Sequence, residues 1–236
     1  MSIFSSIVAG FSQIAFPNVC VCCGHENTQK KHQLCSFCLH ERFEDANPDN
    51  ERASSDTLLP NGILFQQALW QFDKGGVLQH LLHQLKYHRL TTIGSDLGGK
   101  LGERVARNTD LNNLLMAQEV QLLPVPLHYL KYRYRGFNQA FKIAKGFCEG
   151  YRDIPICNRG DVIRHKNTRT QTGFSLDQRL QNMAGAFEVK NCSAVKNKIV
   201  VIIDDVFTTG ATTFELSKTV QEAGAQSVII LTVAQA

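Results

Sequence analysis

One stretch decides the fold that we predict for this chain: Val201-Ile202-Ile203-Asp204-Asp205-Val206-Phe207-Thr208-Thr209-Gly210-Ala211-Thr212. The segment that follows Lys198, as far as Ile203, is a run of apolar, β-branched residues, which is typical of a buried parallel strand. Two carboxylates follow, then a turn of small residues, and then a helix predicted over 212–223 with Gly224 at its C-terminal cap. Ligands of open α/β sheets bind at the carboxyl ends of strands, so this segment predicts a binding site.

The residue types in this segment predict a sugar phosphate as the ligand. The turn can direct backbone N–H groups and three threonine hydroxyls at one phosphate, and the following helix adds its positive N-terminal end. Gly210 permits a close backbone approach that a Cβ would block. The two carboxylates that precede this turn, Asp204 and Asp205, could instead face the two neighbouring hydroxyls of a sugar. An ordinary helix cap is the alternative, but a cap needs only one such residue. We therefore predict phosphate binding by Thr208, Thr209, Gly210, Ala211 and Thr212, and ribose binding by Asp204 and Asp205.

Working outward from this segment, strand and helix patterns alternate along the chain. We expect strands over 63–72, 120–125 and 228–233, helices over 75–87, 93–106 and 138–148, and an extended segment over 155–163. Such alternation predicts an α/β fold with a parallel, doubly wound sheet.

Positive charge is concentrated in the middle of the chain. The net charge of the 236 residues is only +4, yet the segment 128–169 holds ten Lys or Arg against three Asp or Glu. This predicts an anionic ligand: phosphate, pyrophosphate or nucleic acid. Its densest part is a basic stripe of Lys131, Arg133 and Arg135, interleaved with tyrosines. Arginine offers a fork to phosphate oxygens, and aromatic rings among basic residues also suit single-stranded nucleic acid. A solvated basic loop with half-buried tyrosines is the third interpretation.

Five of the eight cysteines lie between residues 17 and 40. Two CxxC pairs, Cys20 with Cys23 and Cys35 with Cys38, predict a closed tetrahedral site for structural Zn²⁺. Disulfides and a redox CxxC are the alternatives, and the spacing leaves open whether Cys22 replaces one ligand of the first pair. Nearby His25, His32 and His40 are further substitutes, whereas Cys148, Cys157 and Cys192 are scattered and read as structural.

The N-terminal segment predicts a small module that precedes the main domain. Its first sixteen residues repeat apolar side chains at helical spacing and lack the basic region of a signal peptide. We expect a helix and zinc-binding module over 1–45, a polar linker over 46–60, and the main domain over 61–236. The chain has no apolar run long enough to span a membrane. We therefore expect a cytoplasmic protein.

The segment 201–212 resembles the phosphoribosyl pyrophosphate motif of the type I phosphoribosyltransferases. That resemblance implies a type I fold, with Asp204 and Asp205 on the ribose hydroxyls and the turn 208–212 on the 5-phosphate. It also implies a pyrophosphate loop at Val125, Pro126, Leu127 and His128, after an earlier strand. A mobile flap would carry Arg164, Lys166 and Arg169, for which an exposed loop is the alternative.

The ordered motifs together resemble the ComF and GntX-like proteins of bacteria. They span the chain from Cys20 to the last strand: the paired CxxC motifs, Leu85-Lys86-Tyr87, Pro124-Val125-Pro126-Leu127, Arg135-Gly136-Phe137-Asn138-Gln139, Thr170-Gln171, Arg179 with Asn182 and Phe187, and the segment 204–212. This family is associated with the uptake of transforming DNA and, by older naming, with gluconate use.

The resemblance leaves two kinds of function open. An enzyme would transfer ribose 5-phosphate from phosphoribosyl pyrophosphate to a nitrogen acceptor, with Mg²⁺ bridging the phosphate oxygens. A binding protein would use the same site as a nucleotide sensor, and its basic stripe and zinc module would hold single-stranded DNA or a partner such as a helicase. The sequence identifies neither the acceptor nor the oligomeric state.

Overall fold

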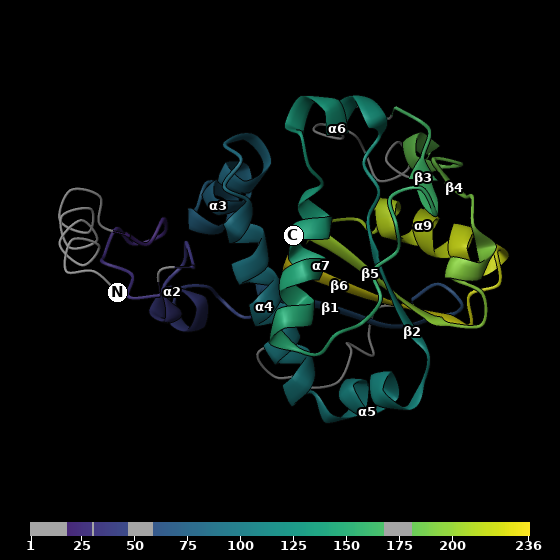
Figure 1. Cartoon of the computed structure of the whole chain (residues 1–236), viewed down its shortest axis with the longest axis horizontal. Coiled ribbons are helices and arrows are strands. Elements are labelled where there is room, and N and C mark those ends of the chain that lie inside the picture. The colour runs from purple at the N-terminus through teal and green to yellow at the C-terminus, as the bar shows by residue number, and fades with distance from the viewer. Residues whose placement is uncertain (1–17, 30, 47–58, 168–180) are drawn as a thin grey trace, which may run out of the picture.

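The computed structural model describes residues 18–29, 31–46, 59–167 and 181–236. Its centre is a sheet of four parallel strands in the order β1-β6-β5-β2 (Figure 1). These strands are β1 (Ile63–Gln71), β2 (Val120–Pro124), β5 (Ile199–Phe207) and β6 (Ser227–Gln235). The predicted parallel sheet is confirmed, and the apolar run before Asp204 is a central strand with a neighbour on each side.

Helices cover both faces of this sheet. One face carries α3 (Val77–Tyr87), α4 (Thr91–Arg107), α5 (Thr109–Ala117) and α7 (Gln139–Gly150), and the other carries α9 (Ala211–Glu222) (Figure 1). Alternate residues of β5 enter different cores, because Val201 and Ile203 pack with α4 and α7 while Val200 and Ile202 pack with α9. Burial on both faces explains why the strand is apolar throughout. The predicted doubly wound architecture is confirmed.

Shorter elements complete the described part of the chain. They are α2 (Ser36–Glu41), α6 (Tyr129–Arg135), β3 (Val162–Arg164), β4 (Phe187–Val189) and a 3₁₀ turn (Cys192–Ala194). The extended segment expected over 155–163 forms a parallel bridge between Ile156 and Leu122, and becomes a strand only at Val162. The sequence patterns did not predict α5, α6 or β4. Strands β3 and β4 pair antiparallel and flank residues 168–180, which lie outside the described residues.

Glycines allow α4 and α7 to pack with their backbones in close approach. A Cβ added at Gly98 would lie 2.0 Å from the carbonyl oxygen of Ile143, and one at Gly146 would lie 2.0 Å from that of Ser95. No side chain fits in that space. The contact holds α7 against α4 and so helps to fix the position of the loop that precedes α7.

The cysteine module packs directly on the body of the protein. Cys20, Leu34 and Cys38 belong to the same buried cluster as α3, α4 and β1. Asp96 of α4 is buried and accepts hydrogen bonds from the backbone N–H groups of Gln33 at 2.7 Å and Leu34 at 2.9 Å. The helix predicted over the first sixteen residues, and most of the linker, lie outside the described residues. In the part of the chain that the structure describes, no helix is both long and apolar enough to span a membrane.

Candidate functional site

The acidic pair lies at the carboxyl end of β5, inside the strand. Both carboxylates are buried, with residue exposures of 9% for Asp204 and 5% for Asp205, and the backbone N–H of Asp205 donates to Oδ1 of Asp204 at 2.9 Å. Burial, together with the charge of Asp205, raises the pKa of Asp204 well above its usual range. Burial would also raise the pKa of Asp205, but its ion pair with Lys86 outweighs that effect and lowers it. The pKa values of these two adjacent carboxyl groups are therefore shifted in opposite directions.

Three sequence motifs meet at Asp205. Lys86, near the end of α3, forms the ion pair, and Gln139, at the start of α7, donates to Oδ1 of Asp205 at 3.4 Å. Arg135 at the end of α6 donates to Oε1 of Gln139 at 2.8 Å, and its guanidinium lies 5.3 Å from the ring centre of Tyr87. The segments 85–87 and 135–139 thus hold one carboxylate and one arginine in place. Sequence reasoning singled out both motifs but did not predict this contact.

Basic side chains outnumber the two carboxylates around this point. Burial and the nearby charges of Arg164, Arg135 and Lys86 lower the pKa of Lys131. Lys131 has no hydrogen bond or ion pair with any other described residue. Burial likewise lowers the pKa of Arg164, although the charge of Asp204 opposes the shift. An excess of half-buried positive charge next to two carboxylates is a favourable environment for a polyanion.

The turn after β5 has the form of a phosphate cradle. Gly210 has a φ of 74° and precedes α9, whose first turn has no side-chain cap. A Cβ at Gly210 would lie 2.3 Å from the ring of Phe214, so only glycine fits. The hydroxyl oxygen of Thr209 is buried and has no hydrogen-bond partner among the described residues. A buried hydroxyl without a partner costs free energy, so it points to a polar ligand that completes it.

The predicted pyrophosphate loop is only partly free to bind. Val125 is a core residue, its N–H donates to the carbonyl of Ile203 at 2.9 Å, and its own carbonyl accepts from Asn138 at 2.9 Å. Pro126 has no N–H. Buried His128 caps α6 by accepting from the N–H of Leu130 at 3.4 Å. The loop therefore offers the backbone of Leu127 and the remaining ring nitrogen of His128.

The predicted basic stripe lies on helix α6, and its three basic side chains differ in their exposure to solvent. Lys131 and Arg135 are half-buried and lie near Lys86, whereas Arg133 is exposed. Of the predicted flap residues, Arg164 in β3 is half-buried near Asp204, and exposed Lys166 donates to the carbonyl of Ala184 at 3.2 Å. Arg169, together with Thr170, Gln171 and Arg179, lies outside the described residues.

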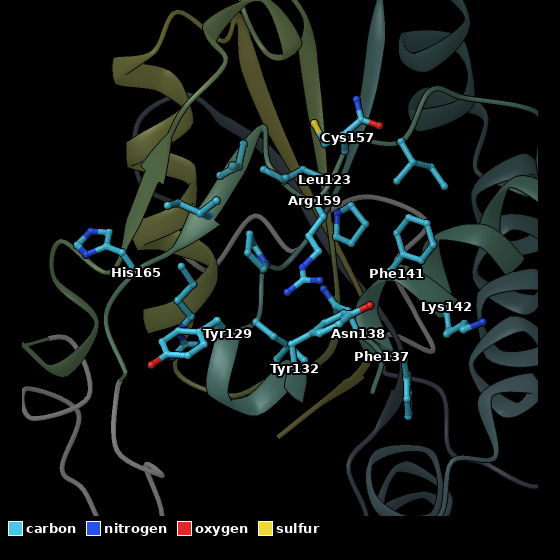
Figure 2. Close-up of a pocket in the computed structure, with 18 of the residues that line it drawn as sticks. Leu123, Tyr129, Tyr132, Phe137, Asn138, Phe141, Lys142, Cys157, Arg159 and His165 are labelled. Atoms are coloured by element: carbon cyan, nitrogen blue, oxygen red, sulfur yellow. The ribbon is translucent and has the colours of Figure 1, made fainter. Parts of the chain in front are cut away.

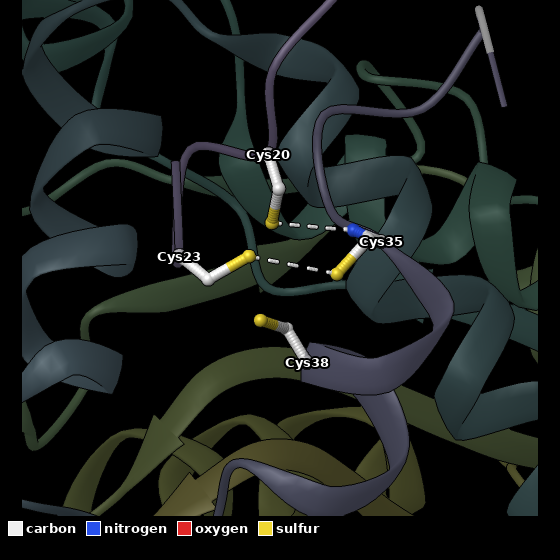
Figure 3. A group of neighbouring side chains, drawn as sticks. All are labelled: Cys20, Cys23, Cys35 and Cys38. Carbon is white, nitrogen blue, oxygen red and sulfur yellow. Dashed lines mark hydrogen bonds between the residues drawn. The ribbon is translucent and has the colours of Figure 1, made fainter. Parts of the chain in front are cut away.

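The four predicted cysteines form one group that could hold a metal ion (Figure 3). Their sulfurs all lie within 4.8 Å of one another, with Cys23 and Cys35 separated by 3.8 Å. Tetrahedral zinc, with bonds of about 2.3 Å, requires sulfurs roughly 3.8 Å apart. Burial opposes ionisation of Cys20, but backbone N–H donors outweigh it and lower the pKa of that thiol to about 7. Cys22 is not a member of the group, and no disulfide links the described cysteines.

Comparison with known proteins finds relatives along almost the whole chain. The chain is 29% identical over 220 residues to competence protein F of Haemophilus influenzae, covering 91% of this chain and 84% of that protein. It is 28% identical over 225 residues to DNA utilization protein YhgH of Escherichia coli K12, covering 91% and 96%. It is 31% identical over 111 residues to competence protein ComFC of Streptococcus pneumoniae, covering 47% and 46%.

Two further comparisons add little. A solved structure described as the allosteric regulatory enzyme of purine biosynthesis matches with a TM-score of 0.36 at 22% identity, over 60% of this chain and 26% of that one. That similarity is too low to bear on the fold or the site. No family model matches the chain.

Proposed function

We propose that this ComF-like chain binds phosphoribosyl pyrophosphate, or another ribose 5-phosphate ligand, and takes part in DNA uptake or use. The second part rests on relatives that are named competence protein F, ComFC and DNA utilization protein YhgH. The first part rests on one observation, which is the turn 208–212 with its unpartnered Thr209 hydroxyl directly after two buried carboxylates and beside a cluster of basic residues.

Each part of the site suits one part of the ligand. The turn and the N-terminus of α9 would bind the 5-phosphate, and the carboxyl groups of Asp204 and Asp205 would accept from the ribose hydroxyls. Lys131, Arg135 and Arg164 would neutralise the pyrophosphate, with the backbone of Leu127 beside them. Arginine binds phosphate oxygens through two parallel hydrogen bonds, which favours it in this role. Mg²⁺ would arrive with the ligand and bind its phosphate and hydroxyl oxygens.

If the chain is an enzyme, it transfers the ribose 5-phosphate unit to a nitrogen acceptor and releases pyrophosphate. Its own residues would then orient the sugar and stabilise the charge that develops there, without acting as a nucleophile. A binding protein would need the same contacts but would leave the ligand intact. Pyrophosphate release, measured with phosphoribosyl pyrophosphate, Mg²⁺ and a panel of acceptors, separates the two.

The experiment that tests the binding site is calorimetry with ribose 5-phosphate and with phosphoribosyl pyrophosphate, each in the presence of Mg²⁺. Thr209→Val removes the unpartnered hydroxyl and keeps the volume, so we expect ribose 5-phosphate affinity to fall by at least about tenfold, as loss of one hydrogen bond to a charged group implies. Thr219→Val on the same helix is the matched control, because its hydroxyl only donates to the carbonyl of Glu215. If the parent protein binds neither ligand at millimolar concentration, the turn is not a ribose phosphate site.

We also propose that the four-cysteine group holds structural Zn²⁺. Four thiolates at tetrahedral spacing form a closed site with no open position for a substrate. Purified protein should then carry one zinc per chain, and Cys35→Ser should lose it. Protein that contains no zinc and has these four thiols free would contradict the proposal.

Single-stranded DNA is a second candidate ligand, favoured by the outer face of α6. Tyr134 is 76% exposed and Tyr129 is 56% exposed, with Arg133 on the same solvent side of the helix. In proteins that bind single strands, the bases stack on aromatic side chains and nearby cations neutralise the phosphates. The affinity should fall steeply with salt, and Arg133→Ala should reduce the slope by roughly one unit. An unchanged slope would remove this face as a DNA contact.

A further inference from the structure

A pocket of about 810 Å³ opens beside the carboxyl end of β2 (Figure 2). Its floor is the sheet edge at Leu123 and Cys157, and its walls come from α6, the start of α7 and β3. The volume lies within the range of about 300–1,000 Å³ that small-molecule sites occupy. No residue of the turn 208–212 lines it, so the pocket is distinct from the turn proposed above for the 5-phosphate, although its wall includes Leu127 and Arg164 from the neighbouring pyrophosphate side.

Aromatic rings and cations together line this pocket. Figure 2 shows Arg159 reaching into the middle of it toward Tyr132, with Tyr129 on one side and Phe141 on the other. The guanidinium of Arg159 lies 3.5 Å from the ring centre of Tyr132. One face of the guanidinium is thus stacked on an aromatic ring, and a planar guanidinium held in this way can take a second flat group against its other face.

The charge of the lining is of one sign. Lys142, Arg159, Arg164 and His165 contribute basic groups, and none of the lining residues in the described part of the chain is Asp or Glu. A purely apolar ligand would make no use of the positive charge of this lining, and a bare polyphosphate would make no use of its rings and apolar floor. The lining therefore fits a molecule that has both a flat ring and an anionic group.

We infer that this pocket binds a nucleotide, with its base stacked against Arg159 and the aromatic wall and its phosphate against the remaining cations. The ring and the phosphate of one nucleotide span the two kinds of surface that the pocket presents. Arg164 also lies near Asp204, so the nucleotide would bind next to the ribose phosphate site without sharing its turn. The inference stands independently of the proposed binding of phosphoribosyl pyrophosphate.

The test is a reciprocal pair of variants, titrated by calorimetry at low salt with two probes: 2′-deoxyadenosine 5′-monophosphate and ribose 5-phosphate. Arg159→Ala should weaken the nucleotide about tenfold, since base stacking on one such side chain has a comparable effect, and should leave ribose 5-phosphate unaffected. Thr209→Val should weaken ribose 5-phosphate and leave the nucleotide unaffected. Tyr132→Leu, a second pocket variant, should behave as Arg159→Ala does. Arg107→Ala, which removes an arginine that is 70% exposed on α4, is the control for loss of charge.

Two further probes establish what the pocket recognises. Deoxyadenosine without phosphate, and inorganic phosphate alone, should each bind at least tenfold more weakly than the nucleotide, because each lacks one of the two contacts. The nucleotide that binds here could be a free molecule or the 5′ end of a DNA strand, and a 5′-phosphorylated strand of ten deoxyadenosines distinguishes the two. If the strand binds much more tightly than the mononucleotide and still requires Arg159, the ligand is a strand end. If the two bind equally, the ligand is a free nucleotide.

The inference is overturned if the parent protein does not bind the nucleotide at millimolar concentration, or if Arg159→Ala and Tyr132→Leu bind it as the parent does. It is also overturned if Thr209→Val abolishes nucleotide binding, because the nucleotide would then occupy the ribose phosphate turn. Circular dichroism melting of each variant shows whether it is folded. Failure of ribose 5-phosphate to bind, with nucleotide binding intact, would count against the proposed function and not against this pocket.

Discussion

Asp204 and Asp205 are neighbours in the sequence but differ in how their charge is compensated. Asp205 has Lys86 and Gln139 against it, and its pKa is lowered. Such a group adds stability above its unfolded pKa, and that stability is lost as the pH falls through the folded pKa. Burial and the charge of Asp205 raise the pKa of Asp204. Its contribution is present below the unfolded pKa and is lost as the pH rises through the folded pKa. At neutral pH one carboxyl therefore supports the fold and the other opposes it.

We predict that replacing each carboxyl with an amide shifts stability in opposite directions. Asp204→Asn should raise the free energy of unfolding at pH 7 by about 1 kcal/mol, because a neutral amide needs neither a buried charge nor the uptake of a proton on folding. Asp205→Asn should lower it by about 3 kcal/mol, because Lys86 is left buried without its partner. Urea unfolding at pH 7 measures both changes.

The pH dependence of the first variant supplies the control. As the pH falls toward the pKa of an aspartate in the unfolded chain, the advantage of Asp204→Asn over the parent should shrink. Shifts of equal sign in the two variants, or an advantage that does not depend on pH, would contradict the opposed pKa directions. Both variants should bind ribose 5-phosphate more weakly, so Asp204→Asn should be more stable than the parent and yet bind this ligand less tightly.

Among the helices, the contact between α4 and α7 depends on missing side chains. We predict that Gly146→Ala destabilises the protein by about 2–3 kcal/mol, because the new Cβ would lie 2.0 Å from the carbonyl oxygen of Ser95 and the helices must separate. Gly160→Ala is the matched control, since no atom lies within 4 Å of the Cβ it would add, and it should change stability by less than about 0.5 kcal/mol. Thermal unfolding of the two variants decides the matter: similar melting temperatures would mean that the interface adjusts without cost.

Elements with a continuous apolar core face could be predicted from the sequence, and others could not. Strand β5 and helix α3 are buried along a regular period, so their patterns identified them. Helix α6 has no buried residue, so it shows no apolar period, and its existence depends on a cap by His128 and a left-handed Gly136 at its end. The basic stripe is therefore a short helix, a conformation that its sequence did not indicate.

The candidate site shows the same division. The turn 208–212 and the cysteine group are local in sequence, and the motifs that predicted them lie where expected. The pairing of Asp205 with Lys86 and Gln139 joins residues from three separate segments. No local pattern specifies which distant lysine meets a carboxylate, because that depends on how the helices pack on the sheet. The aromatic pocket likewise arises only when α6, α7 and β3 come together.

At the scale of the whole molecule, the cysteine module and the main body share one core. The division at residue 45 that the sequence predicts remains untested as a folding boundary, but the described contacts join the two parts. Asp96 accepts two backbone N–H groups and contacts the ring of His32 at 2.6 Å, while Asp45 pairs with Arg104. The backbone N–H of Ala46 also donates to the carbonyl of Leu69 on β1 at 3.1 Å. A metal bound to the cysteines would therefore stabilise the sheet as well as the module.

This coupling yields a prediction that involves chelation. A metal stabilises only the cooperative unit whose unfolding releases it. If Zn²⁺ is bound and the whole chain is one unit, a strong chelator should lower the melting temperature of the parent protein by at least several degrees. Asp96→Ala removes the acceptor of two module N–H groups, so it should lower the melting temperature on its own by about 4–8 °C, from roughly 2 kcal/mol lost at 2–4 °C per kcal/mol.

The decisive measurement is the chelator effect in the variant. With the module uncoupled, the body of Asp96→Ala should unfold without releasing the metal, so the chelator should shift its melting temperature far less than it shifts that of the parent. Asp110→Ala, which removes an exposed carboxylate from α5, should keep the full chelator effect of the parent. Equal chelator shifts in the parent and in Asp96→Ala would mean that Asp96 does not carry the coupling. The buried cluster around Leu34 and Cys38 would then have to join the two parts by itself.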